Sequence, residues 1–334
     1  MTFGILKCNL MQMKIIFIKT KIARLLSRAA ERSKSLKSNA AVLPIFAAAA
    51  IFSFACAGTG EGSNDPNSTS ALPRIVVALK PDKNPDQMLA ERDAAARFLS
   101  DKLGRPVEVV IPLSAAVINE GFANGTIDIG YLSANDLINA KDAELLLVGE
   151  IDGKTTYKSY WLALKDKPYS SIEDLRGKPV AFASKTSTSG YIIPLSDLRK
   201  KELISEKADP EEFFGKGNVF FGTGYVSAVE RVLAGDAEAA AVSYYVLDEN
   251  KHLNVDQRAK LKKIAEQGDV PTHIIAIRKS LAGAEREKLK AALLLLNDAE
   301  NVELRNKLFT SKLVEADAEA HLKPLREALS LLPR

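Results

Sequence analysis

Cysteine and histidine are scarce in this chain, which has two Cys and three His among 334 residues. Cys8 and Cys56 both lie near the beginning, so no disulfide framework can form in the remainder. The sequence also lacks the His-Cys and His-Glu spacings of metal sites, a P-loop, and a recognised pattern of nucleophile, His and acid. We therefore expect no metal, no cofactor and no enzymatic activity.

An excess of positive charge is found only at the beginning of the chain. The net charge is +4, yet residues 1–55 hold nine Lys or Arg against one Glu, which leaves about −4 for the rest. Binding to a phosphate backbone needs a basic surface on the folded protein itself. The charge distribution therefore argues against nucleic acid as a partner.

The basic beginning is followed by a short uncharged stretch. Residues 38–55 contain only about fifteen apolar residues, whereas a membrane-spanning helix needs ~20. A basic region followed by a short apolar region is typical of an export signal. We expect residues 1–55 to be a signal peptide.

Cys56 follows this stretch directly, after the small residues Ser53 and Ala55. The arrangement resembles the lipobox of bacterial lipoproteins, whose cysteine becomes the lipidated first residue, although Ser53 stands where Leu is usual. We expect a protein anchored to a membrane by lipid on Cys56, facing the periplasm or the cell exterior. A plain secretory signal cleaved near Ala55 or Ala57 is the alternative.

Residues 56–71 are rich in Gly, Ser and Asn, a composition that buries little and favours a flexible tether. From Leu72 onward, short apolar runs alternate with segments of helical periodicity. The expected strands are 74–79, 107–111, 127–131, 144–148, 160–164, 179–183, 219–221, 237–242 and 274–277. The expected helices are 85–103, 115–122, 134–140, 172–175, 192–200 and 227–233, with Lys- and Leu-rich helices from Arg286.

This alternation predicts an α/β fold with mostly parallel sheets covered on both faces. We expect two lobes, residues 72–155 with 281–334 and residues 156–280. The strand Ile274–Ile277 is expected to pair near Tyr160–Leu164, after which the chain returns to the first lobe. Two crossings between lobes imply a hinge and a cleft, where ligands tend to bind.

A hydroxyl-rich loop follows the strand Pro179–Ala183. Its sequence, Ser184-Lys-Thr-Ser-Thr-Ser-Gly190, leads into a probable helix start, where free N–H groups and the helix dipole favour an anion. Either these hydroxyls bind a ligand, or one is a helix N-cap and the others are loop residues. A second turn, Gly222-Thr-Gly-Tyr-Val-Ser227, supplies more N–H donors but lacks the third glycine of a dinucleotide fingerprint.

Four further segments occur in a fixed order, and they are Pro81-Asp-Lys-Asn-Pro85, Gly104-Arg-Pro-Val-Glu-Val-Val110, Gly125-Thr-Ile-Asp-Ile-Gly-Tyr131 and Ser171-Ile-Glu-Asp-Leu-Arg-Gly-Lys178. With Ser-Thr-Ser-Gly at 187–190, they resemble the substrate-binding proteins of phosphonate, phosphite and phosphate ABC transporters. The likeness runs from about Leu72 to the C-terminus. It implies a two-lobed type II periplasmic-binding-protein fold that captures a phosphorus oxyanion for an ABC permease and ATPase, and we expect a monomer.

The resemblance also implies site residues. The phosphoryl ligands of the family fall on Ser187, Thr188 and Ser189, and an aromatic pocket residue falls on Tyr160. Relatives often have a His where this chain has Tyr225. Two acidic positions that hold the ammonium of aminoalkyl phosphonates fall on Tyr245 and His273.

One family tyrosine ligand is missing, because Ser114-Ala115 stands where relatives have Asp-Tyr. A buried ammonium without a carboxylate is costly, so a bare phosphate, phosphite or small alkyl phosphonate is the expected ligand. His252 and His321 lie in polar surroundings and are expected at the surface. A sensory or partner-binding lipoprotein of the same fold, or an enzyme acting on a phosphorylated small molecule, is the alternative.

Overall fold

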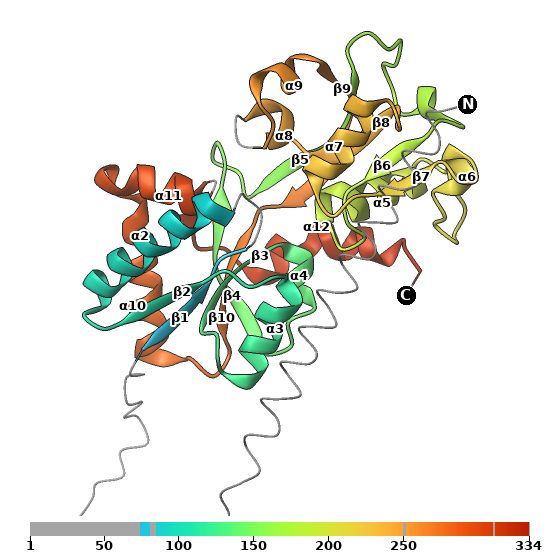
Figure 1. Ribbon diagram of the computed structural model, residues 1–334. Helices are drawn as coiled ribbons and strands as arrows, with labels where there is room; N and C mark the ends of the chain where they lie inside the picture. The colour runs from blue at the N-terminus through green and yellow to red at the C-terminus, as the bar shows by residue number, and fades with distance from the viewer. Residues whose placement is uncertain (1–73, 81–84, 250–251, 310, 334) are drawn as a thin grey trace, which may run out of the picture. The chain divides into compact units, whose positions relative to one another are not determined.

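The computed structural model describes residues 74–80, 85–249, 252–309 and 311–333. The predicted signal peptide, Cys56 and the tether lie outside the described residues. Among the helices of the described part, none is long and apolar enough to cross a membrane. The account of the fold therefore concerns the α/β body (Figure 1).

The order of elements follows the alternation expected from the sequence. The strands are β1 (Ile75–Ala78), β2 (Val107–Val110), β3 (Ile129–Leu132), β4 (Ala143–Glu150), β5 (Thr156–Leu164), β6 (Val180–Phe182), β7 (Val219–Phe221), β8 (Ala239–Ser243), β9 (Leu261–Pro271), β10 (Ile274–Arg278) and β11 (Lys312–Val314). The helices are α2 (Pro85–Leu103), α3 (Ala115–Asn124), α4 (Ala134–Ile138), α5 (Ile193–Lys200), α6 (Glu211–Phe214), α7 (Tyr225–Ala234), α8 (Tyr245–Asp248), α9 (Val255–Ala259), α10 (Gly283–Leu294), α11 (Val302–Leu308) and α12 (Ala318–Ser330). Short helical turns are η1 (Glu173–Leu175), η2 (Thr188–Ile192), η3 (Leu295–Asn297) and η4 (Ala299–Asn301).

Two mixed sheets organise the body. The sheet of lobe I has the strand order β11-β4-β10-β3-β1-β2, and that of lobe II has the order β7-β6-β8-β5-β9. In the first sheet β2, β1, β3 and β4 run in the same direction, and in the second sheet β7, β6, β8 and β9 do. Most strands of each sheet therefore share one direction, as expected, whereas β5, β10 and β11 run the opposite way and pair antiparallel with their neighbours.

Helices cover both faces of each sheet, as the alternation predicted. In lobe I, α2, α10 and α11 pack on one face and α3 and α4 on the other (Figure 1). In lobe II, α5 and α6 cover one face and α7 and α8 the other. Helix α12 contributes Leu322, Leu325 and Ala328 to a core of lobe I and also contacts α5 and β9 of lobe II.

The strand Ile274–Ile277 was expected beside Tyr160–Leu164, and this prediction is wrong. As part of β10, it pairs with β3 and β4 in the sheet of lobe I. The strand that pairs with residues 160–164 at the sheet edge is β9, which was not predicted and which pairs with β5 along most of its length. The chain therefore returns to lobe I between β9 and β10. An apolar run indicates a strand, but the strand with which it pairs is determined by the tertiary structure.

Asp128, the acidic residue of the Gly125–Tyr131 motif, joins three strands of lobe I. Its carboxylate accepts hydrogen bonds from the backbone N–H of Val76 at 2.9 Å and from the Arg278 guanidinium at 2.8 Å. Asp128 is only 4% exposed, so these donors compensate for its lost hydration. This part of the family motif therefore maintains the sheet that ends at the cleft.

Thr272 connects the two chain crossings between the lobes. Its Oγ1 donates toward the carbonyls of Gly149 at 2.6 Å and Thr155 at 3.0 Å, which flank the crossing from β4 to β5. On its other side, Nε2 of His321 in α12 lies 3.2 Å from the Thr272 carbonyl. His321 is 4% exposed, so its expected surface position is wrong. The polar residues near it in sequence lie on the opposite side of an amphipathic helix.

We expect the substitution Thr272→Val to lower the free energy of unfolding by about 1–3 kcal/mol, because it leaves the buried Gly149 carbonyl without this donor at unchanged side-chain shape. Urea denaturation of the two proteins measures the effect. Thr272→Ser keeps the hydroxyl and is expected to lose less. Equal stability of the valine variant and the wild type would contradict this role.

Candidate ligand-binding site

A cavity of about 530 Å³ lies between residues of lobe I and lobe II. Its wall is rich in hydroxyl and aromatic side chains. The lining residues are Lys80, Leu113, Ser114, Ala115, Ser133, Asp136, Tyr157, Ala183, Ser184, Thr186, Ser187, Thr188, Thr223, Gly224, Tyr225, Val226, Ser227, Tyr245, His252 and His273. Many of them follow β1, β3, β6 and β7, at the ends of the parallel strands where α/β proteins place ligands.

The hydroxyl-rich loop after β6 turns sharply before it becomes helical. The Ser187 N–H donates to the Ser184 carbonyl at 2.9 Å. The Ser187 carbonyl then accepts from the N–H groups of both Tyr191 and Ile192, which makes the first helical turn, η2, a π-type turn. A Cβ on Gly190 would lie 2.5 Å from the Ala183 Cβ, so only glycine permits this packing against β6.

Ser187 is both a helix cap and a lining residue of the cavity. Its Oγ accepts a hydrogen bond from the Gly190 N–H at 3.0 Å, as an N-cap does. The two interpretations left open by the sequence are therefore compatible at this residue. A capping hydroxyl that accepts from the backbone still has its own proton to donate.

Thr188 is the next lining residue, at the first position of η2. It is 4% exposed, and its Oγ1 has no hydrogen-bond partner within the described structure. Buried hydroxyls are normally satisfied, because a buried hydroxyl without a partner loses its hydration with no compensation. This hydroxyl is thus an available donor in the cavity wall.

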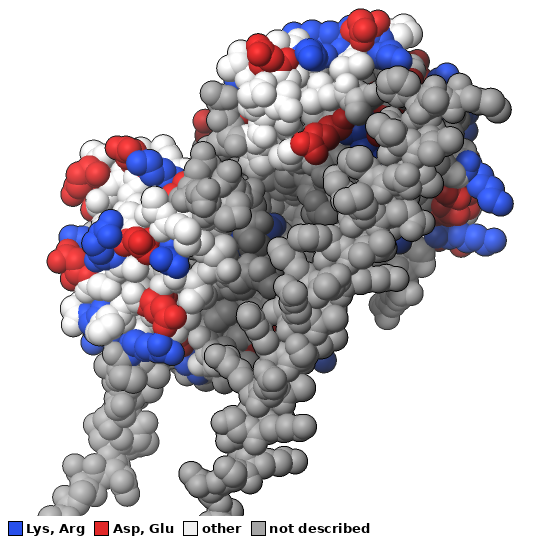
Figure 2. Space-filling view, in the orientation of Figure 1, with Lys and Arg blue, Asp and Glu red and all other residues white. Residues whose placement is uncertain are grey.

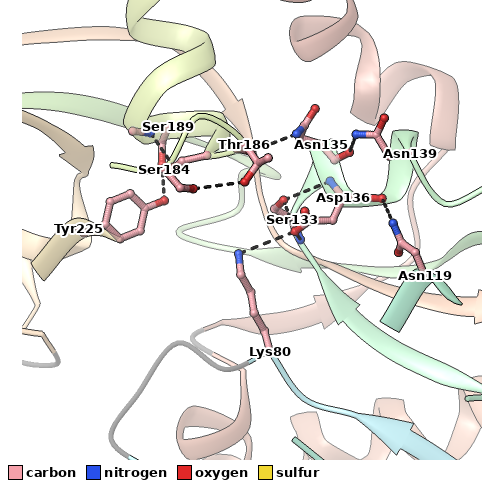
Figure 3. A network of polar contacts seen from close by, with 12 residues as sticks. Lys80, Asn119, Ser133, Asn135, Asp136, Asn139, Ser184, Thr186, Ser189 and Tyr225 are labelled. Carbon is pink, nitrogen blue, oxygen red and sulfur yellow. Dashed lines mark hydrogen bonds and ion pairs between the residues drawn. The ribbon is translucent and has the colours of Figure 1, made fainter. Parts of the chain in front are cut away.

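Ser189 lies behind the cavity wall rather than on it. Its side chain is fully buried, and its Oγ lies 2.6 Å from the Tyr225 hydroxyl (Figure 3). The Tyr157 hydroxyl also donates to Ser189 Oγ, at 3.3 Å. In addition, Ser159 Oγ donates to the Ser189 carbonyl at 2.6 Å. Ser189 therefore positions two tyrosines that themselves line the cavity.

An aromatic wall faces the hydroxyl-rich loop and consists of Tyr157, Tyr225, Tyr245, His252 and His273. Tyr225 and Tyr245 meet edge to face at 5.7 Å, and the ring of His252 lies 4.9 Å from that of Tyr245. Tyr157 and His273 are nearly parallel at 6.4 Å. Packed rings of this kind hold their polar atoms in defined positions.

Both Tyr157 and His273 are kept neutral by their surroundings. Burial raises the pKa of Tyr157 well above its ordinary value, and the nearby Tyr225 adds to this effect. Burial lowers the pKa of His273 to about 3, with smaller contributions from the positive charge of Lys80 and from His252. These two side chains therefore offer hydrogen bonds without a formal charge at neutral pH.

Lobe I contributes the opposite side of the cavity. Asn135 in α4 donates to the Thr186 carbonyl of lobe II at 3.0 Å, so a hydrogen bond bridges the lobes beside the cavity (Figure 3). Ser133 and Asp136 form a capping box at the start of α4. The Lys80 ammonium, just after β1, lies 4.0 Å from the Asp136 carboxylate (Figure 3).

Comparison with known proteins identifies the class of this molecule. Residues 77–321 match the family described as ABC transporter, phosphonate, periplasmic substrate-binding protein. The chain belongs to this family. It is therefore the extracytoplasmic substrate-binding component of an ABC import system, as the ordered motifs predicted.

Three relatives illustrate the family. The phosphate-import protein PhnD of Mycolicibacterium smegmatis is 25% identical over 255 residues, covering 73% of this chain and 78% of that protein. The methylphosphonate complex of PhnD1 from Prochlorococcus marinus has a TM-score of 0.66 at 18% identity, covering 77% of this chain and 97% of that one. The binding component of an ABC phosphonate transporter from Pseudomonas aeruginosa has a TM-score of 0.65 at 19% identity, covering 77% and 85%. The two-lobed fold of the substrate-binding proteins is confirmed.

The structure brings five of the seven predicted site residues of this substrate-binding protein to the cavity wall: Ser187, Thr188, Tyr225, Tyr245 and His273. Ser189 lies directly behind it. Tyr160 does not line the cavity. Its hydroxyl donates to the Asp248 carboxylate at 2.9 Å, and the Lys263 ammonium lies over its ring, 4.6 Å from the ring centroid. Alternate residues of a strand face opposite sides, so Tyr160 points away from the side that Tyr157 and Ser159 share.

Sequence reasoning missed several lining residues of the substrate-binding protein, above all Lys80, Tyr157 and His252. Tyr157 was within reach of that reasoning, because it shares the strand face of Ser159, two residues before it. Lys80 directly follows a buried strand, a position that also signals a ligand site. His252 gave no local signal, and its expected surface position is corrected by its place in the cavity wall.

The N–H groups of the second turn are also used differently from the expectation. Those of Thr223 and Gly224 donate to Ser227 Oγ, at 2.9 and 3.2 Å. The turn lines the cavity, but these two donors are occupied. The N–H groups of Tyr225 and Val226, at the start of α7, are the ones that a helix leaves without an intrahelical acceptor.

Charge on the visible outer surface is mixed. On the face in Figure 2, Lys and Arg side chains lie among Asp and Glu side chains over the described residues. A nucleic-acid-binding face would present one sign of charge along a continuous stripe. This face is consistent with the small-molecule role of the family.

We expect the stability of this substrate-binding protein to fall as the pH is lowered from about 6.5 towards 3. His273 has a folded-state pKa of about 3, below the ordinary value of 6.5, so the unfolded chain takes up the proton first as the pH falls. The stabilisation that comes from keeping His273 neutral in the folded protein is fully present above about pH 6.5 and is lost as the pH falls towards 3. Urea denaturation at several pH values measures it.

The variant His273→Gln is expected to show a smaller loss over the same range. Part of the dependence will persist, because burial also lowers the pKa of His321. Stability between about pH 7 and pH 8 serves as the control and is expected to be flat for this group. An unchanged dependence in the variant would show that His273 is not responsible.

Proposed function

We propose that this substrate-binding protein captures a compact phosphorus oxyanion, which is phosphate, phosphite or a small alkyl phosphonate, in the cavity between its lobes. The observation that carries the proposal is the hydroxyl of Thr188, buried in the cavity wall with no partner of its own. An oxyanion at this point would accept a hydrogen bond from the Thr188 hydroxyl. The same anion would lie at the start of the helix formed by η2 and α5, where the helix dipole favours negative charge.

The remaining donors suit a desolvated anion. Ser187, Tyr225, Tyr245 and neutral His273 can each donate without bringing a buried charge that must itself be compensated. Two more helices, α3 and α7, also begin at the cavity, with Ser114 and Gly224 as their first capping positions. Three helix N-termini and a set of hydroxyls thus converge on the site.

The cavity offers little to an amino group. Asp136 is the one carboxylate among the described lining residues, and it accepts the Ser133 hydroxyl at 2.6 Å within its capping box. Tyr245 and His273 occupy the positions that the family resemblance assigned to ammonium-binding acids. An ammonium placed there would lack an anionic partner. We therefore favour a bare or alkyl-substituted oxyanion over aminoalkyl phosphonates, in keeping with relatives named for phosphate and solved with methylphosphonate.

Delivery to the permease and ATPase subunits follows from the family role, and we propose that it depends on lobe closure. Most of the neutral donors come from lobe II, whereas Lys80, Ser114 and α4 belong to lobe I, so an anion bound by both lobes stabilises the closed form. The hydrogen bond from Asn135 to Thr186 joins the lobes at the same place. We propose binding without turnover, which an assay for released product with phosphorylated substrates would test.

The substitution Thr188→Val separates binding from stability. Because Thr188 Oγ1 makes no internal hydrogen bond, its removal is expected to leave the free energy of unfolding unchanged or slightly raised. Loss of a hydrogen bond to a charged ligand is expected to weaken binding by about 1.5–3 kcal/mol, or roughly 10- to 100-fold. Isothermal titration calorimetry with phosphate, phosphite and methylphosphonate measures this loss.

Two further variants complete the experiment. Ser187→Ala is expected to lose both affinity and about 1 kcal/mol of stability, since it removes a cap as well as a ligand donor. Ser196→Ala, on the same helix but bonded to the Ile193 carbonyl, is expected to keep full affinity. If the wild-type protein bound none of the three anions, the proposed ligand class would be wrong.

We also propose that the protein is a monomeric lipoprotein anchored through Cys56 and exported by the signal peptide over residues 1–55. The basic leader, the short apolar stretch and the small residues before Cys56 support this proposal. A flexible tether over 56–71 would let the body reach a permease.

Replacing Cys56 with Ala is expected to move the protein from the membrane fraction to the soluble exported fraction, because the lipid can no longer attach. Fractionation of cells expressing the full chain, followed by immunoblotting, measures the distribution. Cys8→Ala is the matched control and is expected to change nothing. Retention of the Cys56 variant in the membrane fraction would contradict lipidation at this residue.

A further inference from the structure

Lys80 is the one lysine or arginine among the described residues that line the cavity. It lies two residues beyond the end of β1, and its side chain is 27% exposed. The donors proposed above are hydroxyls and neutral rings, which hydrogen-bond to any oxyanion of suitable size. A lysine in the wall adds a different property, because its attraction grows with the charge of the ligand.

Asp136 does not neutralise Lys80 fully. Its Oδ2 accepts the Ser133 hydroxyl at 2.6 Å and the Ser133 N–H at 3.2 Å, and it lies in the first turn of α4. The Lys80 ammonium is 4.0 Å from the same oxygen, beyond hydrogen-bond distance. The carboxylate is therefore stabilised by its own helix start, and the ammonium keeps donors for another partner.

The charge of Lys80 also reaches the inner wall. It contributes to the lowered pKa of His273, which stands on the aromatic side of the cavity. An anion bound between His273 and the hydroxyl-rich loop would lie within the same field. Positive charge from lobe I and neutral donors from lobe II thus act on one volume.

We propose that Lys80 is the residue that selects the charge state of the ligand, so that the protein prefers dianionic phosphorus oxyanions to monoanionic ones. This inference rests on the proposed function and adds to it the class of anion. The hydroxyls and helix starts recognise the tetrahedral oxygens, and Lys80 favours the second negative charge. Asp136 opposes it moderately, because a carboxylate repels the same charge.

Titration of inorganic phosphate well above and well below its second pKa tests the proposal with a ligand of constant shape. We expect the wild-type protein to bind the dianion at least about tenfold more tightly than the monoanion. Lys80→Met is expected to lose about tenfold in affinity for the dianion and much less for the monoanion, so that the preference shrinks. Lys80→Arg is expected to retain the preference.

Matched variants isolate the effect of this one charge. Lys185→Met removes a lysine from the hydroxyl-rich loop whose ammonium lies over the Phe221 ring and outside the cavity wall, and it is expected to behave as the wild type. Asp136→Asn is expected to tighten binding of the dianion. The titratable groups that line the cavity with Lys80 are Asp136, Tyr157, Tyr225, Tyr245, His252 and His273. Burial, the largest cause of the lowered pKa of His273, is present in every variant.

The outcomes separate the two proposals. If Lys80→Met, folded as judged by its unfolding midpoint, keeps the wild-type preference for the dianion, the inference is wrong and the proposed function stands. If the wild-type protein binds no phosphate, phosphite or methylphosphonate at either pH, the proposed function fails and the inference fails with it. Lys80→Gln provides a second neutral variant, should the methionine variant not fold.

Discussion

The pairing of two chain crossings is the constraint on which the rest of this structure depends. Strands β4 and β5 carry the chain from lobe I to lobe II, and β9 and β10 carry it back beside them in the opposite direction. Thr272, in the second crossing, hydrogen-bonds to carbonyls on either side of the first crossing. A ring nitrogen of His321 in α12 lies within hydrogen-bond distance of the Thr272 carbonyl. Two sheets joined in this way can rotate about a narrow region while each keeps its own core.

This arrangement explains where the binding groups come from. The parallel strands of each sheet end at the side where the lobes face each other, and the loops that follow them carry Lys80, Ser133, Ser187 and Tyr225. Each lobe alone presents half of a cavity. An anion contacts donors on all sides only when the two lobes close on it, so ligand binding is coupled to lobe closure.

Two kinds of group line the cavity, neutral hydrogen-bond donors and one positively charged side chain. Ser187, Thr188 and the tyrosines offer neutral hydrogen bonds, and Ser189 holds Tyr157 and Tyr225 in place from behind. Burial keeps His273 neutral, so this side chain of the aromatic wall adds no formal charge. The positive contribution is concentrated in Lys80, beside a carboxylate already stabilised by Ser133. The lysine therefore comes from lobe I, whereas most of the neutral side-chain donors come from lobe II.

Local sequence alone indicated the family and many of the elements, although the strands β9 and β11 were not predicted. The helix Pro85–Leu103 and the strand Val219–Phe221 were predicted with the bounds that the structure has, because apolar spacing and the glycine after Leu103 are local signals. The hydroxyl-rich loop was also predicted from local sequence, because its hydroxyl residues are consecutive and follow a strand. Only the tertiary structure decided which strands pair: β10 joined lobe I, and Tyr157 rather than Tyr160 faced the cavity. It also brought Lys80, His252 and His273 to one cavity. Such contacts join residues far apart in the chain, and no local pattern encodes them.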